Sequence, residues 1–451
     1  MTRIERDSVG EMNIADTAYY GVNAARAQEN FKITDNLLDT DFIISLAEIK
    51  KACALTNREL NVLEPAIATA IVRACDDIIG GKLHDQFIVD PLQGGAGTSS
   101  NMNANEVIAN RAIEYLGGTR GDYSIVHPND HVNKGQSTND VYPSAGKLTL
   151  LKKVPLLMAQ LDYLETTLLQ KSDRYQDVMK LGRTQLNDAV ALSVGDEIHA
   201  YYTVISRNHQ RILNATNELL RINLGGTAIG TGLNSHPDFP QTAAKILREM
   251  TGFNFLPSQD LIDGTQNVES YAVLADNLKT LALSLSKIAN DIRLLSSGPL
   301  SGIGEYRIPA KQNGSSIMPG KINPVIPEIV NQCAFAVIGN NMTISMAVEA
   351  GQLELNAFEP VIFYKLLESF QYLTRVIDTF VTNCLVDLEP DPQRCLENLE
   401  NSTSLATDLS KVVGYSRAAK IAKDTVKSKD DFRTTALKDG IPEKLVKQLH
   451  Y

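Results

Sequence analysis

The 451-residue sequence is poor in several residue types and patterns, and each shortage narrows what the protein can be. Its five cysteines are an odd number without metal-ligand spacing, so we expect reduced, structural thiols and neither a disulfide framework nor a metal site. No uninterrupted apolar run is long enough to cross a bilayer, and the N-terminal segment lacks the apolar core of a signal peptide. These absences predict a cytoplasmic protein without a membrane partner.

Positive charge is also in short supply. The 43 Lys and Arg residues are outnumbered by 53 Asp and Glu residues, which gives a formal net charge of -10 at pH 7. Binding to nucleic acid or to an anionic membrane is therefore disfavoured. The chain is longer than the size at which one hydrophobic core normally stops growing, so we expect two or three structural regions.

Strand-like alternation is scarce, and helical periodicity dominates the central half of the chain. In residues 274–295, apolar residues recur at alternating steps of four and three. The members of this series are Leu274, Leu278, Leu281, Leu285, Ile288, Ile292 and Leu295. Such a heptad seam needs partner helices, which predicts a bundle. Further helical patterns cover 145–180, 189–222, 324–350 and 354–387.

The sequence therefore predicts a mainly α fold with three regions. Residues 1–140 mix shorter helices with loops, residues 141–390 form a long central helical bundle, and residues 391–451 form a small helical domain. The boundary before the last region is the run "DLEPDPQRC", in which two prolines stand among acidic residues.

Four stretches are rich in hydroxyl and amide groups and poor in charge. "GSSIMPGKINPVIPE" at 314–328 combines prolines and glycines, which describes a loop of defined shape. The other three are "GGAGTSSNMN" (94–103), "GQSTND" (135–140) and "GRTQLND" (182–188). Taken singly, each is explained as well by an ordinary connection or a Ser/Thr helix cap, and the first could also hold an anion on free N–H groups.

Together, these stretches offer many neutral hydrogen-bond donors and one cation, Lys321, which suits the binding of carboxylates. Removing a proton from the carbon next to a carboxylate creates a dianionic aci-carboxylate, and each well-placed donor lowers that barrier by roughly 3 kcal/mol. No histidine lies within the four stretches, so a serine is left as the candidate base. Loop N–H groups and Lys321 would have to stabilise its alkoxide.

These motifs resemble those of the aspartase/fumarase superfamily. "GSSIMPGKINP" is similar to the signature loop of that superfamily, and "GTSSNMNANEV", "GQSTND" and "GRTQLNDAV" resemble its other blocks in the same order. The likeness runs from about residue 3 to the C-terminus. Within the superfamily, "KINPVIPEIVNQ" resembles the aspartase form, because fumarases carry a Thr-Gln-Cys-Glu run after the Asn-Pro.

The resemblance implies reversible deamination of L-aspartate to fumarate and ammonia. It also implies a homotetramer in which the bundles of four subunits form one multi-helix core and each active site draws on three chains. No organic cofactor is implied and no bound metal is required, although divalent metals activate some members of the superfamily.

Residue roles are carried over in the same way. Ser315 is expected to be the general base that takes the Cβ proton. The β-carboxylate is expected to be held by Thr98, Ser137, Thr138 and Ser316, and the α-carboxylate by Thr184, Lys321 and Asn323. Asn139 is expected to help place the amino group. Gln185 stands where fumarases and some aspartases have a histidine, and we take it to favour the ammonia-lyase reaction because ammonia, unlike hydroxide, leaves without an acid.

Two alternatives stay open at this point. One is a fumarase or another lyase of the same fold that forms fumarate from malate or a substituted aspartate. The other is a scaffold protein without turnover, against which the polar composition of the 314–328 loop counts.

Overall fold

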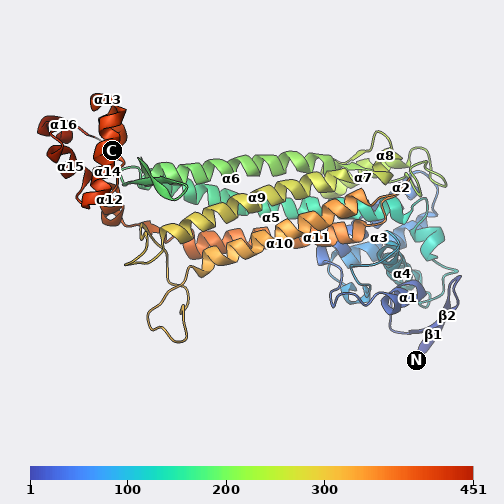
Figure 1. Cartoon of the computed structure of the whole chain (residues 1–451). Helices are drawn as coiled ribbons and strands as arrows, with labels where there is room; N and C mark the ends of the chain where they lie inside the picture. Colours follow the sequence, from blue (N-terminus) through green and yellow to red (C-terminus); the bar gives the residue numbers. More distant parts are fainter. Residues whose placement is uncertain (450–451) are drawn as a thin grey trace. The chain divides into compact units, whose positions relative to one another are not determined.

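The computed structural model describes residues 1–449 and is mainly α-helical (Figure 1), as the sequence predicts. The long helices are α5 (Thr138–Arg174), α6 (Val194–Thr216), α9 (Glu269–Leu295), α10 (Val325–Glu349) and α11 (Glu359–Phe380). The shorter ones are α1 (Val22–Asn30), α2 (Thr40–Glu59), α3 (Pro65–Ile79), α4 (Thr98–Tyr115), α7 (Phe239–Thr251), α8 (Asp263–Gln266), α12 (Pro392–Glu400), α13 (Leu405–Val413), α14 (Tyr415–Ser428), α15 (Phe432–Lys438) and α16 (Glu443–Lys447).

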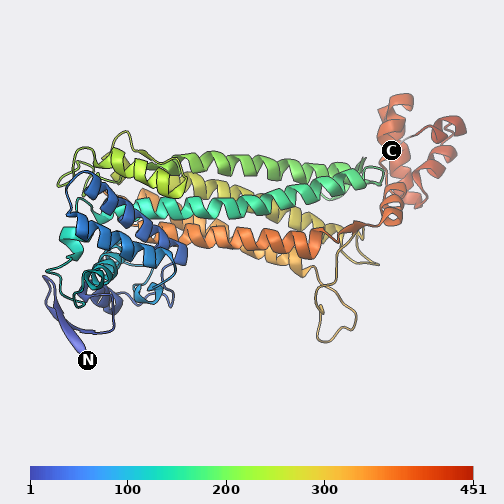
Figure 2. The ribbon, with the colours of Figure 1, turned by 180° about the vertical axis from the view of Figure 1, so that it is seen from behind.

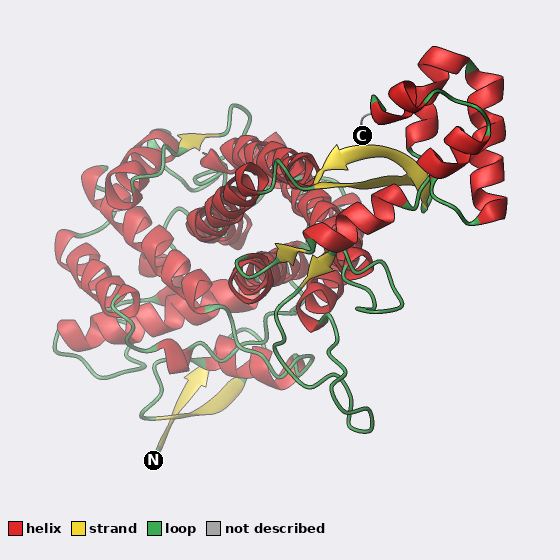
Figure 3. Cartoon of the chain, turned by 90° about the vertical axis from the view of Figure 1, so that its left-hand side faces the viewer, coloured by secondary structure: helices red, strands yellow, loops and turns green. Residues whose placement is uncertain are grey.

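Strands are few and short, and they form only two-stranded sheets in the described residues (Figure 3). The pairs are β1 (Thr2–Arg6) with β2 (Glu11–Ala15), β3 (Met179–Thr184) with β4 (Asn187–Ser193), β5 (Arg221–Ile222) with β6 (Leu256–Pro257), and β7 (Tyr306–Arg307) with β8 (Glu389–Pro390). All are antiparallel except β5 with β6.

The contacts divide the chain into two compact units, each built from three stretches of sequence. Unit 1 contains residues 1–157, 211–279 and 336–372, and unit 2 contains residues 158–210, 280–335 and the chain from 373 onward. The units are not consecutive in sequence because the long helices pass from one to the other. The domain limits expected at 140 and 390 stay a prediction.

The heptad seam of α9 is confirmed. All seven of its apolar members are buried, with at most 7% of the surface of any one exposed. The helices expected at 324–350 and 354–387 correspond to α10 and α11. The helix expected at 145–180 begins and ends earlier, as α5 (Thr138–Arg174), and the helix expected at 189–222 is shorter, as α6 (Val194–Thr216). Between them, residues 179–184 pair with residues 187–193 as the hairpin β3–β4.

Aromatic rings form the core of unit 1 where its helices meet. Phe363 of α11 lies 5.7 Å from Tyr142 of α5 and 4.9 Å from Tyr271 of α9, measured between ring centroids. Phe42 of α2 packs on both Tyr142 and Phe363. Gly146 of α5 leaves room for the Phe363 ring, since a Cβ at this position would lie 2.0 Å from it. The sequence therefore needs a glycine inside this helix.

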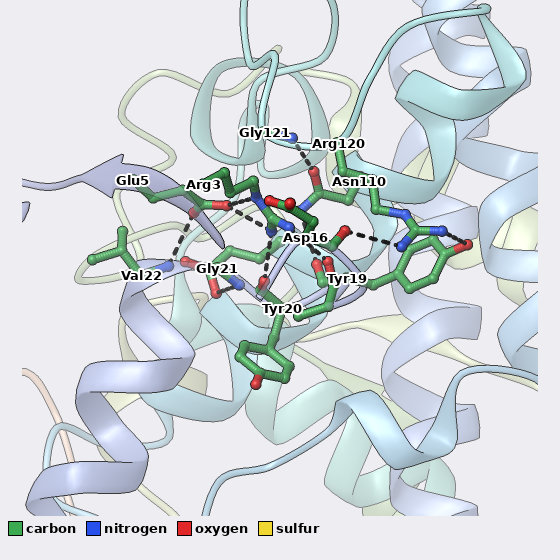
Figure 4. Close-up of polar contacts among 12 residues, drawn as sticks. Arg3, Glu5, Asp16, Tyr19, Tyr20, Gly21, Val22, Asn110, Arg120 and Gly121 are labelled. Atoms are coloured by element: carbon green, nitrogen blue, oxygen red, sulfur yellow. Dashed lines mark hydrogen bonds and ion pairs between the residues drawn. The ribbon is translucent and has the colours of Figure 1, made fainter. Parts of the chain in front are cut away.

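Two arginines bind the backbone and side chains of residues 15–20 (Figure 4). Arg3 of β1 donates to the carbonyl oxygens of Ala15, Ala18 and Tyr20 at 2.9–3.0 Å. Arg120 donates to Thr17 O and to the Tyr19 hydroxyl, at 2.7 and 2.8 Å. The irregular backbone of residues 15–20 is thereby satisfied by side chains rather than by a sheet.

In unit 2, polar side chains join neighbouring helices. Asn331 of α10 donates to the Ser286 hydroxyl of α9 at 2.8 Å, and Asn208 of α6 donates to Ser284 of α9 at 2.9 Å. The last helices of the chain, red in Figures 1 and 2, gather around a cluster of their own. Its buried members are Leu405, Leu409, Ile421, Phe432, Ala436, Ile441, Val446 and Leu449.

No helix within residues 1–449 combines the length and apolarity that a membrane span needs. The cytoplasmic location stays a prediction.

Candidate active site

The loop that carries Ser315 makes its hydrogen bonds mostly within itself. The Ser315 Oγ accepts hydrogen bonds from the backbone N–H groups of Ile317 and Met318, at 3.2 and 3.0 Å. Gly314 N donates to Lys321 O at 2.8 Å, and the Asn323 amide donates to Gly314 O at 2.8 Å. A serine oxygen that accepts from the N–H groups two and three residues later forms a local Ser/Thr turn, which fixes the position of the Ser315 hydroxyl.

The same loop is open to solvent. Ser315 and Asn323 are half-buried, whereas Ser316 and Lys321 are exposed. The Lys321 ammonium can therefore reach an anion that approaches the loop.

The stretch 135–140 starts the helix α5, and its serine is a helix cap. The Ser137 Oγ accepts from Asn139 N at 3.2 Å, and Ser137 N donates to the Asp140 carboxylate at 3.0 Å. This reciprocal pair is a capping box. The capping interpretation is thus correct for Ser137, although a hydroxyl oxygen that accepts one hydrogen bond still has its own proton to donate to a ligand.

Asp140 is a functional candidate that the sequence analysis missed. Its buried carboxylate also accepts from Gly225 N and Thr227 N, at 3.0 and 2.9 Å. Burial raises the pKa of Asp140 to about 6, while hydrogen bonds from the backbone of Ser137, Thr227 and Gly225 act in the opposite direction. The Ser-x-x-Asp spacing could have revealed this role.

Thr138 and Asn139, next to Ser137, make hydrogen bonds to residues outside the 135–140 stretch. Thr138 is buried, and its hydroxyl accepts from the Asn101 amide of α4 at 3.1 Å. The Asn139 amide donates to Ala228 O at 2.7 Å. The backbone of residues 137–140 is therefore fixed by several elements of unit 1.

Thr98 is the first residue of α4. The N-cap is Gly97, with a positive φ of 91° and no room for a side chain, since a Cβ would lie 2.5 Å from the Tyr142 ring. The expectation of a Ser/Thr cap here is wrong. Two N–H groups of the first turn are occupied, because Thr98 N bonds Gly95 O and Ser100 N bonds the Gln93 amide oxygen. The exposed Thr98 hydroxyl donates its one proton to Gly95 O at 2.7 Å, so it can bind a carboxylate only after exchanging that hydrogen bond.

Thr184 and Gln185 lie at the tip of the β3–β4 hairpin. Thr184 pairs with Asn187, so Gln185 and Leu186 form a two-residue turn. Both have positive φ, 54° and 64°, as a type I′ turn requires. Neither residue favours this conformation, and such strain is often found at functional sites. Thr184 and Gln185 are exposed at this tip.

The ten candidate residues are divided between the two units. Unit 1 contains Thr98, Ser137, Thr138 and Asn139, and unit 2 contains Thr184, Gln185, Ser315, Ser316, Lys321 and Asn323. In the unit 1 group, Ser137 and Asn139 are joined by a hydrogen bond. Among residues 1–449, no group of three or more His, Cys, Asp or Glu side chains is arranged to hold a metal ion.

Exposed hydroxyl groups in both units and the exposed ammonium group of Lys321 in unit 2 are groups that can bind carboxylic acids. A model of the family described as "Lyase" matches residues 10–339. The chain belongs to this family, which is part of the aspartase/fumarase superfamily.

Two curated relatives cover nearly the whole chain. Aspartate ammonia-lyase of Helicobacter pylori (strain J99) is 48% identical over 441 residues, which is 97% of this chain and 94% of the relative. Aspartate ammonia-lyase of a Bacillus species is 46% identical over 439 residues, again 97% of this chain and 94% of the relative.

Solved structures share the fold. "Fumarate lyase:delta crystallin" from Brucella melitensis, bound to cobalt, has a TM-score of 0.96 at 46% identity and covers 100% of this chain and 98% of its own. Class II fumarase from Schistosoma mansoni has a TM-score of 0.97 at 33% identity, with coverage of 100% and 98%.

Proposed function

We propose that the protein is an aspartate ammonia-lyase, which removes ammonia from L-aspartate to leave fumarate and catalyses the reverse addition. The observation that carries this proposal is the pair of full-length relatives with that activity at 46–48% identity. The 314–328 loop supports it independently, because two N–H groups converge on the Ser315 Oγ.

Ser315 is the proposed general base. Its alkoxide takes the proton from Cβ, and the electron pair of that C–H bond moves into the β-carboxylate to give the aci-carboxylate. The electron pair from the former C–H bond then forms the Cα=Cβ bond while the C–N bond breaks. The electrons of the C–N bond stay on nitrogen, which leaves as neutral ammonia. The N–H groups of Ile317 and Met318 support the alkoxide form of the base.

The other candidates bind the two carboxylates and the amine. The proposed β-carboxylate ligands are Thr98, Ser137, Thr138 and Ser316, and the proposed α-carboxylate ligands are Thr184, Lys321 and Asn323. Asn139 and Gln185 are proposed to face the amino group. Neutral donors suit the binding of the β-carboxylate, because their hydrogen bonds to it become stronger as the aci-carboxylate gains negative charge.

We further propose a homotetramer in which each active site combines residues of three chains. The division of the ten candidates between two units supports this arrangement. So does α10, which is apolar on a second face: its Phe335, Met342 and Met346 are 62–66% exposed in the single chain, while Val330 and Val337 are buried. Large apolar side chains that are exposed together on one helix face are typical of a surface covered by a partner.

The proposed reaction requires no organic cofactor, since protein donors supply the anion binding and a serine supplies the base. Activation by a divalent metal is compatible with this mechanism. Turnover that persists after dialysis against a chelator, with or without stimulation by added Mg²⁺, is the expected result.

The deciding experiment follows fumarate formation by ultraviolet absorbance after purified protein is added to L-aspartate, with L-malate in parallel. Fumarate from aspartate alone is expected. Fumarate from malate alone would instead assign the protein to the fumarases, and no product from either would favour a substituted aspartate or a scaffold role.

A further inference from the structure

A fully buried carboxylate, Glu305, lies at the start of the segment that leads to the Ser315 loop. The Arg183 guanidinium holds it with two hydrogen bonds, Nη2 to Oε1 at 2.8 Å and Nη1 to Oε2 at 3.1 Å. Lys180 adds a second cation, with its Nζ 3.3 Å from Oε2. The Glu305 side chain has no exposed surface, and that of Lys180 is only 2% exposed. One acid thus binds two cations of the same strand, β3.

This strand is the one that ends in Thr184. Arg183 directly precedes Thr184, and the hairpin turn follows at Gln185. A two-point contact between a guanidinium and a carboxylate fixes distance and orientation together. The position of the hairpin tip therefore depends on the Arg183–Glu305 pair.

The main chain at Glu305 and Tyr306 is also bonded to residues 390 and 391, much later in the sequence. Glu305 O accepts from Asp391 N at 2.8 Å, and Tyr306 pairs with Pro390 in the β7–β8 sheet. Asn398 of α12 donates to Glu305 Oε1 at 3.0 Å. These contacts anchor the start of the segment, and Ser315 follows ten residues later.

A second acid extends the network. Glu197 of α6 accepts from Lys180 at 2.7 Å and also accepts the hydroxyl proton of Tyr306. Lys180 thus bridges two carboxylates, Glu197 and Glu305. Burial raises the pKa of Glu305, but the hydrogen bond from Arg183 and the charge of Lys180 outweigh it, so the pKa lies below its ordinary value. Glu305 is therefore ionised at neutral pH.

We propose that Glu305 is a positioning residue for the reaction, which fixes the hairpin that carries Thr184 and the root of the loop that carries Ser315. This inference rests on the proposed roles of Thr184 and Ser315. In a tetramer with shared sites, these two residues of one chain can serve different sites, and Glu305 then positions parts of both.

The test is the Glu305→Gln variant of the full-length protein, with kcat and KM measured separately for the substrate that the unaltered protein turns over. Glutamine keeps the shape but loses the charge that binds Arg183 and Lys180. We expect KM to rise about fivefold, because Thr184 is displaced, and kcat to fall about tenfold, because the Ser315 loop loses its anchor. Arg183→Lys keeps the positive charge without the two-point contact and should change both constants in the same direction by less.

The matched control is Asp439→Asn. Asp439 also binds an arginine and a lysine, Arg417 at 3.0 Å and Lys420 at 2.6 Å, but it lies in the C-terminal cluster away from both segments in sequence. This variant should leave kcat and KM within about twofold of the unaltered protein.

A purely structural role for Glu305 predicts a different result. Partial unfolding reduces the number of active molecules, which lowers the apparent kcat and leaves KM unchanged. That outcome, or no change in either constant, would overturn the proposal. If the Glu305→Gln variant does not fold, the kcat and KM of the Arg183→Lys variant test the proposal in the same way. Absence of turnover in the unaltered protein would overturn the proposed function itself, and this inference with it.

Discussion

The segment 135–140 and the loop 314–323 carry similar polar residues, but they are held in opposite ways. Residues 138 and 140 accept hydrogen bonds from α4 and from Gly225, Asn139 donates one to Ala228 O, and Thr138 and Asp140 are buried. The 314–323 loop is bonded chiefly to itself, and most of its side chains are exposed.

The difference separates two tasks that one site needs. A carboxylate-binding surface works best when its donors are fixed before substrate arrives. A segment that must close over substrate needs few bonds to its surroundings, so that rearrangement costs little free energy. Under the proposed roles, unit 1 supplies donors that are fixed in place and the Ser315 loop supplies groups on an exposed segment.

The Ser315→Ala variant is expected to have the largest effect, and it tests whether the 314–323 loop carries the base. The variant should lower kcat about a thousandfold and leave KM within about threefold, because it removes a group needed only for proton transfer. Steady-state rates with L-aspartate provide the measurement, and Ser316→Ala, a loss of one donor, is the milder control. Substantial turnover by Ser315→Ala would place the base elsewhere.

Lys321→Ala tests whether the loop also binds substrate. KM should rise about tenfold and kcat should fall as well, since a charged partner of the α-carboxylate is lost in both the ground state and the transition state. Lys311→Ala, outside the motif in the same unit, is the control for loss of one positive charge. An unchanged KM for Lys321→Ala would remove Lys321 from the substrate.

Asp140→Asn tests the fixed side of the comparison. The carboxylate holds three backbone N–H groups, so the free energy of unfolding should fall by about 1–3 kcal/mol and KM should rise as Ser137 and Thr138 shift. Urea unfolding and initial rates measure the two effects. The control Asp238→Asn changes an N-cap aspartate that makes no cap hydrogen bond. Equal effects from both variants would contradict the assigned role.

The smallest expected effect is on the stability of the folded protein at acid pH, through Asp77 of unit 1. Burial raises the pKa of Asp77, but hydrogen bonds from Lys82, Tyr115 and Arg111 outweigh it and lower the pKa to about 2, below the ordinary 3.8. The contribution of Asp77 to stability is therefore complete above pH 3.8 and is lost as the pH falls through 2. Melting temperatures across this range should fall less steeply for Asp77→Asn, and parallel curves would contradict the prediction.

Much of the helical framework could be predicted from the sequence. The apolar period of α9 required partners on one side, and all of its seam residues are buried. The hairpin at 179–193 was missed because its turn, Gln185–Leu186, contains none of the glycine or asparagine that normally accompanies positive φ. The pairing of β3 with β4, rather than the preference of the two turn residues, accounts for that conformation.

The candidate site could also be predicted only in part from the sequence. Motif resemblance found the polar groups, and the Ser-x-x-Asp spacing contained enough information to find Asp140. Glu305 could not be found in this way, because its partners Arg183 and Asn398 lie about a hundred residues away on either side and only the fold brings them together.

The most direct test of the central claim, that sites combine fixed donors and a Ser315 loop from different chains, is a mixing experiment. Ser315→Ala and Ser137→Ala proteins, each nearly inactive, are unfolded together, refolded as mixed tetramers and assayed with L-aspartate. Sites shared between chains predict recovery of about a quarter of the unaltered activity, because random assembly gives that fraction of sites both intact serines. A mixture no more active than its two components would contradict shared sites.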